Sequence, residues 1–350
     1  MVEPGSAGLP PFPDGWFVIG FDDELPARRV IARRFMGQEL VLYRTESGRV
    51  CVSDAHCPHL GAHLGHGGTV VGESIRCPFH GFRFDPTGAC VATGYGTKPP
   101  AVRIEPWPVH ETHGLILVHH APDRAAPTWR VPDLAQDGWT QFLHRTYTIR
   151  AHPQESTENS VDLGHFGLLH GFRSVEMTEE PVVDGAYLST RYTARWMVAS
   201  REIPFAFRTH IHGLGYSLVE AKVAGGVVEL RLLVLPTPLD ARESALRLAL
   251  QVRRIPHGGV IHRSLRAVPG RALSAMVARA LFEAFARATH QDVPIWEHKR
   301  FLERPALAKG DGPIALYRRW ARQFYPERRD DTADERPALR LAATSVGVQG

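Results

Sequence analysis

The chain has 350 residues, enough for about two domains of roughly 100–200 residues each. Its 43% hydrophobic and 22% charged residues exclude a disordered chain. No apolar run approaches the roughly 18 residues of a membrane span, and the start lacks the basic and apolar regions of a secretory signal. The net charge of +4 is spread as isolated Arg pairs, which argues against nucleic-acid binding. We therefore expect a cytoplasmic protein, with association at a membrane surface left open.

The first half of the chain has the pattern of an all-β domain. Residues 1–15 are rich in Pro and Gly and predict a flexible arm. Across 16–121, short strand-type runs such as WFVIG (16–20) alternate with turn signals. Residues 122–140 contain three Pro and little periodicity, which predicts a linker.

The second half, residues 141–325, mixes both types of secondary structure. Its strand-type runs are 144–153, 186–200 and 227–238, and its helical patterns are 154–172 and 271–303, the latter interrupted near Pro294. The tail, 326–350, has the composition of a disordered segment. The sequence thus predicts an all-β domain followed by an α+β domain.

The first constellation of metal-ligand residues lies in the all-β domain. Cys57-Pro-His59 is followed after 17 residues by Cys77-Pro-Phe-His80. Zinc could bind two thiolates and two imidazoles tetrahedrally, but each turn here supplies one Cys and one His. That pattern favours a Rieske [2Fe-2S] cluster, in which both Cys bind one iron and both His bind the other.

Other Cys and His residues surround these two turns. We interpret Cys51 and Cys90 as small buried side chains in strands rather than redox groups. His56, His63 and His66 are interpreted as loop polarity or as hydrogen-bonding partners of the cluster, not as ligands.

A second candidate metal site lies in the α+β domain. His165 and His170 are five residues apart, so they would lie about 140° apart on an ideal helix. Asp292 follows in the late helical pattern, where Pro294 favours a break that aims the carboxylate inward. Two His and one carboxylate form the facial triad of non-haem Fe(II). The spacing alone leaves a structural role for both His open.

Asp292 has competitors in the same segment. We interpret Glu283 and Glu297 as members of a solvated helix face, and we rank His290 and His298 below Asp292 as ligands. Asp162 precedes His165 by three residues, so its carboxylate could accept the Nδ1–H of that ring.

Together the two motifs resemble the Rieske non-haem iron oxygenases over residues 16–305, most closely the sterol and steroid branch. The family pattern N-x-x-D-x-x-H-x-x-x-x-H maps onto Asn159, Asp162, His165 and His170. Ala62 and Phe79 occupy positions where respiratory Rieske proteins carry an extra Cys pair. The resemblance therefore implies a low-potential cluster that serves an oxygenase.

The family resemblance implies a helix-grip catalytic domain, in which a curved antiparallel sheet wraps a long helix. It also implies a head-to-tail homotrimer, in which Asp162 links the cluster of one subunit to the iron of the next. The cofactors would be one [2Fe-2S] cluster and one mononuclear Fe(II) per subunit, with O₂ and NAD(P)H as cosubstrates. The sequence contains no dinucleotide-binding fingerprint, so electrons must come from a separate flavin/iron-sulfur reductase, with or without a ferredoxin.

The expected activity is monooxygenation or desaturation of a large apolar substrate, such as a sterol or steroid. Its pocket would include Phe166, Leu168, Leu169, Phe205 and Phe207. An alternative is a non-steroid aromatic, amine or alkaloid substrate. An aromatic acid would favour a buried Arg in the pocket, for which Arg191, Arg208 and Arg231 are candidates. Two other classes remain: an electron-transfer protein, and a lipid-binding module with a vestigial metal site.

Overall fold

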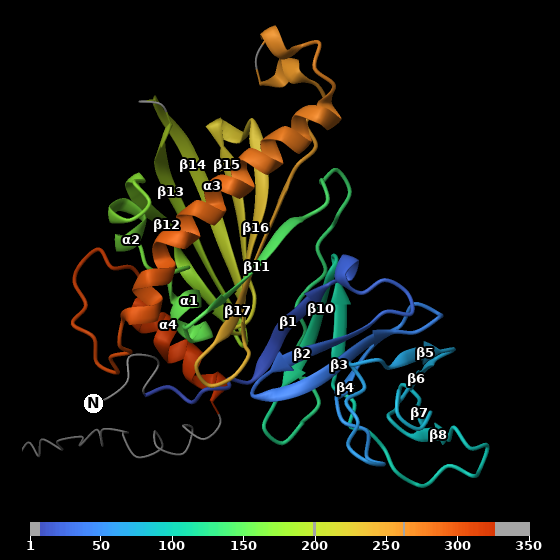
Figure 1. Ribbon diagram of the computed structural model, residues 1–350. Helices are drawn as coiled ribbons and strands as arrows, with labels where there is room; N and C mark the ends of the chain where they lie inside the picture. Colours follow the sequence, from blue (N-terminus) through green and yellow to red (C-terminus); the bar gives the residue numbers. More distant parts are fainter. Residues whose placement is uncertain (1–7, 199–200, 262, 326–350) are drawn as a thin grey trace, which may run out of the picture.

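The structure is a computed structural model that describes residues 8–198, 201–261 and 263–325 (Figure 1). The first part of the predicted arm and the whole predicted tail lie outside these residues. Three small antiparallel sheets build the N-terminal part. They comprise β1 (Gly15–Phe21), β10 (Leu115–His120) and β9 (Val109–Thr112); β2 (Val30–Phe35), β3 (Gln38–Arg44) and β4 (Val50–Asp54); and β5 (Thr69–Val71), β6 (Ser74–Arg76), β7 (Arg83–Phe84) and β8 (Cys90–Ala92).

The first two N-terminal sheets share an apolar core. Alternate residues of β1, β3 and β10, among them Phe17, Leu40 and Ile116, point into it and are fully buried. A second core lies between the third sheet and the side chains on the other face of β3 and β4, and Cys57 and Cys77 belong to it. Both predicted cluster turns lie at this third sheet, one between β4 and β5 and the other between β6 and β7.

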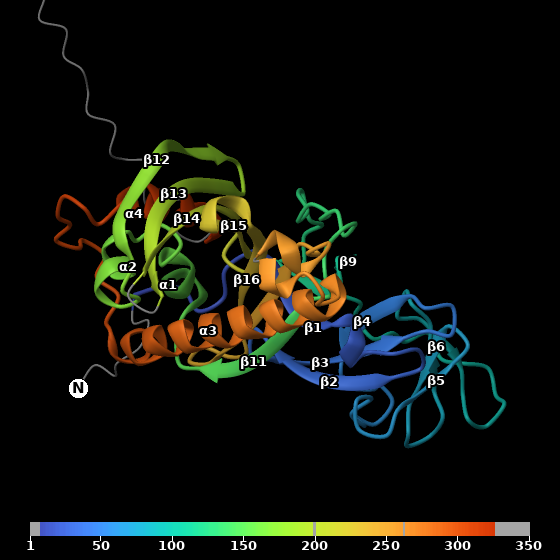
Figure 2. The same cartoon turned by 90° about the horizontal axis from the view of Figure 1, so that it is seen from above.

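A seven-stranded antiparallel sheet forms the C-terminal part, in the order β11-β17-β16-β15-β14-β13-β12. Its strands are β11 (Leu143–Ile149), β12 (Arg173–Asp184), β13 (Tyr187–Val198), β14 (Arg201–His212), β15 (Ser217–Val223), β16 (Val228–Pro238) and β17 (Ser244–Val252). The long helix α3 (Gly270–His298) lies across one face of this sheet (Figures 1 and 2). The predicted helix-grip architecture is therefore confirmed.

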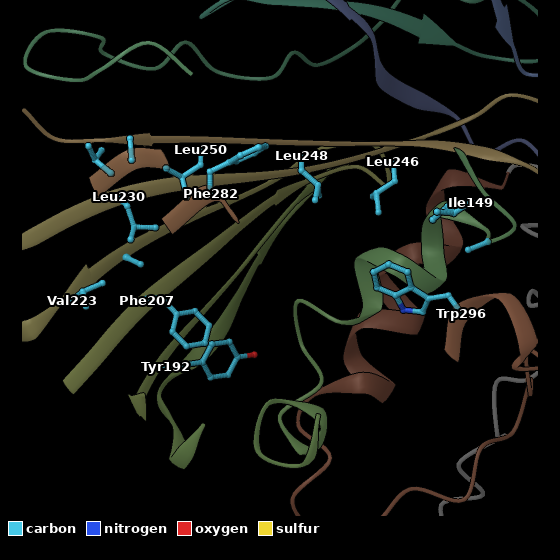
Figure 3. Close-up of a cluster of buried hydrophobic side chains, with 14 residues drawn as sticks. Ile149, Tyr192, Phe207, Val223, Leu230, Leu246, Leu248, Leu250, Phe282 and Trp296 are labelled. Atoms are coloured by element: carbon cyan, nitrogen blue, oxygen red, sulfur yellow. The ribbon is translucent and has the colours of Figure 1, made fainter. Parts of the chain in front are cut away.

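The core under α3 follows from the alternation along β17. Leu246, Leu248 and Leu250 point to the same side of the sheet and meet Phe282 of the helix (Figure 3). The helix runs through Pro294 without a break, so the predicted interruption is wrong. Proline removes one backbone hydrogen bond, while the turns on both sides of it stay packed through the buried Asp292 and Trp296.

The predicted helix 154–172 is also wrong, because the structure has two short helices there. These are α1 (Pro153–Glu158) and α2 (Gly164–Leu168), joined by an irregular turn. Within this turn the amide of Leu163 donates to the carbonyl of Asp311, 3.1 Å away. This partner is remote in sequence, and it diverts the backbone from the helical path.

The N-terminal part packs on the face of the large sheet opposite α3. Trp16, Val18 and Leu117 meet Leu233 and other side chains of β15–β17 in a shared core. Arg247 of β17 is buried at this junction and donates to the carbonyls of Val18 and Ile19 at 2.8 and 3.0 Å.

The remaining elements close the other edge of the molecule. Helix α4 (Ile314–Ala321) packs against α1, and residues 8–14 contact the segment that follows α4, where the amide of Asp14 donates to Phe324. Short 3-10 turns occur at Asp22–Glu24, Ala224–Gly226, Gly258–Val260, Arg263–Leu265 and Arg322–Phe324. Within the described ranges, none of the helices has the length and apolarity to cross a bilayer.

Candidate metal centres and the apolar cavity

The two predicted cluster turns have the same backbone geometry. The amide of Gly61 donates to the carbonyl of Cys57 at 2.9 Å, and Gly81 donates to Cys77 at 3.2 Å. Both glycines have a left-handed backbone, with φ of 75° and 70°, which favours Gly. At Gly81 a side chain would also meet the backbone of Gly94 at 2.9 Å.

The side chains of these turns fit an S₂N₂ metal site. Cys57 and Cys77 are buried free thiols; burial and the neighbouring Cys77 raise the pKa of Cys57 to about 11. The His59 and His80 rings lie 4.7 Å apart, nearly perpendicular. The buried Nδ1 of His80 has no hydrogen-bond partner among the described residues, as expected for a nitrogen that binds metal.

His165, His170 and Asp292 converge from two parts of the chain. His165 lies in α2, His170 follows that helix, and Asp292 lies in α3. Their nearest donor atoms are all within 4.8 Å of one another, and Nε2 of His170 is 3.4 Å from Oδ1 of Asp292. The structure therefore brings together the three side chains that the sequence indicated as a facial triad.

Both imidazoles are oriented through Nδ1. Nδ1 of His165 donates to the backbone carbonyl of Asp162 at 2.8 Å. The Asp162 carboxylate lies 3.7 Å from that nitrogen and accepts the His165 amide at 3.2 Å, so the expected Nδ1–carboxylate bond is wrong. Asp162 lies in the turn before α2, which places its carbonyl nearer the ring. Nδ1 of His170 donates to Gln291 at 3.2 Å.

A chain of two hydrogen bonds holds the third member of the triad. The side-chain amide of Asn159 donates to Oδ1 of Asp292 at 3.1 Å, and the indole of Trp296 donates to Asn159 at 3.2 Å. Trp296 fits the family pattern of an Asp followed by a Trp, but its hydrogen bond to Asn159 was not predicted. Gln291 was not predicted at all, and its only signal in the sequence is its position directly before Asp292.

Electrostatics couple these groups in pairs. Burial would lower the pKa of His170, but the Asp292 carboxylate outweighs it and the pKa is raised. Burial would raise the pKa of Asp162, but hydrogen bonds and charge from His165 outweigh it and lower the pKa.

The competitors of Asp292 have other partners. Glu283 forms an ion pair with Arg145 at 2.7 Å, and Glu297 accepts the amide of Arg150 at 3.1 Å. His290 packs edge-on against Tyr147. The ring of His298 contacts the carbonyl of Pro294. Among the described residues, none of the four belongs to the group of donor atoms that His165, His170 and Asp292 form.

An apolar cavity adjoins the triad, between the sheet and α3. Phe166, Phe205 and Phe207 line it as predicted, together with side chains such as Trp196 and Phe285. Two predicted members do not line it, because α2 is short and directs them elsewhere: Leu168, which is 95% exposed, and Leu169. Apart from the triad, the lining side chains in the described part of the chain carry no charge.

The three Arg residues considered for a substrate carboxylate lie outside this cavity. Arg191 and Arg208 both pair with Glu179. Arg231 pairs with Glu220 at 2.9 Å. Each guanidinium therefore has a carboxylate partner within the protein, and Arg191 and Arg208 share theirs.

The two candidate metal centres are far apart within one chain. Figures 1 and 2 both place β5–β8 at the opposite end of the molecule from α2.

Two family models match this chain, one over each half. The Rieske [2Fe-2S] domain model matches residues 15–105, and the 3-ketosteroid 9alpha-hydroxylase C-terminal domain model matches residues 118–325. Cholesterol 7-desaturase nvd of Bombyx mori is 32% identical over 335 residues, covering 92% of this chain and 72% of the relative. The 3-ketosteroid-9-alpha-monooxygenase oxygenase component of Rhodococcus rhodochrous is 28% identical over 357 residues, covering 95% and 89%.

Solved structures share the fold at lower identity. Dicamba monooxygenase bound to dicamba superposes with a TM-score of 0.63 at 18% identity, covering 89% of this chain and 96% of that one. NdmA of Pseudomonas putida CBB5 with caffeine gives a TM-score of 0.66 at 17% identity, covering 88% and 89%.

Proposed function

We propose a function from the premise that this chain belongs to the Rieske oxygenase family of the cholesterol 7-desaturases and 3-ketosteroid 9α-monooxygenases. It is the oxygenase component that uses O₂ and electrons from a separate reductase to hydroxylate or desaturate a C–H bond of a sterol or steroid. The observation that carries this proposal is the uncharged apolar cavity beside His165, His170 and Asp292.

The chain supplies ligands for two metal groups. Cys57, His59, Cys77 and His80 would hold the [2Fe-2S] cluster, and the triad would hold mononuclear Fe(II). When bound, these groups supply electron transfer and oxygen activation. The protein orients the ligands through the Asp162 carbonyl, Gln291 and Asn159, and the apolar walls keep water from the bound substrate.

The separation of the two centres supports a head-to-tail homotrimer. In that assembly the cluster turns of one subunit lie against α2 of the next, and the partly exposed Asp162 carboxylate connects them. The reductase, with or without a ferredoxin, passes electrons from NAD(P)H to the cluster. We place this system in the cytoplasm, with the sterol taken up from a membrane surface.

The cavity favours a neutral apolar substrate over an aromatic acid. A buried carboxylate needs a charged partner, and the Arg candidates are paired elsewhere. A fused-ring hydrocarbon needs apolar contact over most of its surface, which the aromatic and aliphatic lining supplies. The chemistry then depends on placing one C–H bond near the triad.

A reconstituted turnover tests this proposal. Purified protein, a surrogate reductase, NADH and O₂ are incubated with a sterol and steroid panel, and products are identified by mass. Gain of one oxygen atom identifies hydroxylation, and loss of two hydrogens identifies desaturation. With both metal groups loaded, the absence of product and of substrate-stimulated NADH consumption across the panel would refute the sterol assignment.

A further inference from the structure

A second group of potential ligands lies beside the first cluster turn, outside both centres described above. Glu39 is in β3, and His56 and His63 face each other across an isolated antiparallel bridge in the turn. Backbone bonds fix this arrangement: the amide of Ala55 donates to Glu39 at 3.1 Å, and that of Leu64 donates to Ala55 at 2.7 Å.

The three side chains point toward one centre. Oε2 of Glu39 lies 3.5 Å from Nε2 of His56 and 3.8 Å from Nε2 of His63, and the three donor atoms are within 4.8 Å of one another. These separations exceed good hydrogen bonds. They are close to the ~3.4 Å between two ligands that each bind zinc at about 2.0–2.1 Å in a tetrahedron.

The hydrogen bonding of the His63 ring also favours a metal site. Its Nε2 is shielded from solvent and has no hydrogen-bond partner among the described residues, although a carboxylate lies just beyond bonding range. Nδ1 accepts the amide of Gly65 at 3.0 Å. A cation bound through Nε2 would move the ring proton to Nδ1, so this one backbone hydrogen bond would be exchanged for a metal bond.

We infer that Glu39, His56 and His63 form a second, mononuclear site for a divalent cation such as Zn²⁺. Two imidazoles and one carboxylate are ligands of this borderline metal, with water completing the tetrahedron. The bound ion ties β3 to the turn that begins at Cys57, the neighbour of His56 in sequence. This inference does not depend on the substrate or activity of the enzyme.

Metal uptake tests the inference on the iron-loaded protein. Zn²⁺ alone is equilibrated with the protein by dialysis, and metals are counted per chain. We expect one Zn²⁺ per chain in the wild type, none in His56→Ala/His63→Ala, and at least tenfold weaker binding in Glu39→Gln. His144→Ala is the matched control: Nε2 of His144 meets the single carboxylate of Asp23 at 2.9 Å, and uptake should be unchanged.

X-ray absorption at the zinc edge checks where the ion binds. The expected shell contains N and O with two imidazoles, and Asp292→Ala should still take up the zinc because it alters only the other site. Sulfur in the shell, or equal uptake by wild type and the double His variant, would overturn the inference. If the double variant loses the visible spectrum of its cluster, the test rests on zinc binding by Glu39→Gln, because this substitution removes the charge and leaves the shape of the side chain almost unchanged.

Discussion

Asp292 is a buried carboxylate whose environment is set by residues that would not touch iron. Asn159 donates to its Oδ1, and Trp296 fixes which end of the Asn159 amide faces it. Hydrogen bonds of this kind orient metal ligands and commonly change metal affinity or activity by about 10–100-fold. Asn159 and Trp296 therefore act as positioning residues of the proposed iron site.

Asn159→Ala should weaken mononuclear iron binding by about 10–100-fold, and Trp296→Phe should have a smaller effect because the amide stays in place. The measurement is iron retained after dialysis against a chelator, with the visible spectrum of the cluster as an internal reference. Wild-type iron retention in Asn159→Ala would show that the amide does not position Asp292.

A substitution at Asp162 can distinguish the role of its backbone carbonyl from the role of its carboxylate. Asp162→Asn keeps the carbonyl that holds His165, so both metal groups should stay bound. Electron transfer from cluster to iron should fall at least about tenfold, measured by single-turnover kinetics of the reduced protein. Glu283→Gln, an exposed acid on α3, is the control. Unchanged transfer in Asp162→Asn would remove the carboxylate from the electron path.

At the scale of elements, α1 is a short helix whose residues are all buried, and it carries Asn159 at its end. Its Glu158 receives two hydrogen bonds from Arg318 of α4, at 2.6 and 2.8 Å. Removing one partner of a buried pair leaves an uncompensated charge, which costs about 3–5 kcal/mol. The ion pair between Glu158 and Arg318 therefore stabilises the helix that carries Asn159.

Arg318→Met should lower the free energy of unfolding by about 3–5 kcal/mol, measured by denaturant titration. Glu158→Gln/Arg318→Met should be less destabilised, because no charge is left alone. Arg145→Met, which breaks the exposed pair with Glu283, should cost no more than about 1 kcal/mol. If Arg318→Met lowered the free energy of unfolding by only about 1 kcal/mol, the buried ion pair would not stabilise α1 as we propose.

The elements also show what sequence patterns can and cannot predict. The strands β13 and β16 and the helix α3 were predictable, because alternation and helical periodicity reflect local geometry. The helix-grip arrangement of these elements was implied by the family resemblance. The break between α1 and α2 depends on the bond from Leu163 to Asp311, and the continuity of α3 past Pro294 depends on packing. Local sequence patterns give no information on this hydrogen bond or on this packing. The triad was predicted through the resemblance to a family pattern, because the spacing of the two His alone left a structural role open. The contact of Gln291 with His170 joins residues 121 apart in sequence and could not be predicted from a local pattern.

At the scale of the whole molecule, the two halves are joined by a buried interface that contains Arg247, a residue usually found at surfaces. Several histidines are also enclosed by the fold. Burial lowers the pKa of four of them to about 4: His113, His119, His152 and His212. These groups are neutral in the folded protein and bind protons on unfolding.

The sign of the pH dependence follows from this difference. In the unfolded chain these His side chains bind protons below their ordinary pKa of about 6.5. In the folded chain the same side chains stay neutral until about pH 4. The free energy of unfolding is therefore highest above pH 6.5 and falls as the pH drops from 6.5 to 4. His119→Phe should remove up to about 2 kcal/mol of the loss between pH 7 and pH 5. Denaturant titrations at both pH values measure it; an unchanged difference would contradict neutral burial of His119.

We propose that one chain holds a [2Fe-2S] cluster that transfers electrons and a separate iron beside an apolar cavity. The most direct measurement is the ratio of iron to labile sulfide in purified wild type and Asp292→Ala, with the cluster spectrum recorded in both. We expect about three iron to two sulfide in the wild type, and two to two in the variant, with its cluster intact. A ratio of two to two in wild-type protein supplied with iron would contradict it and leave an electron-transfer protein.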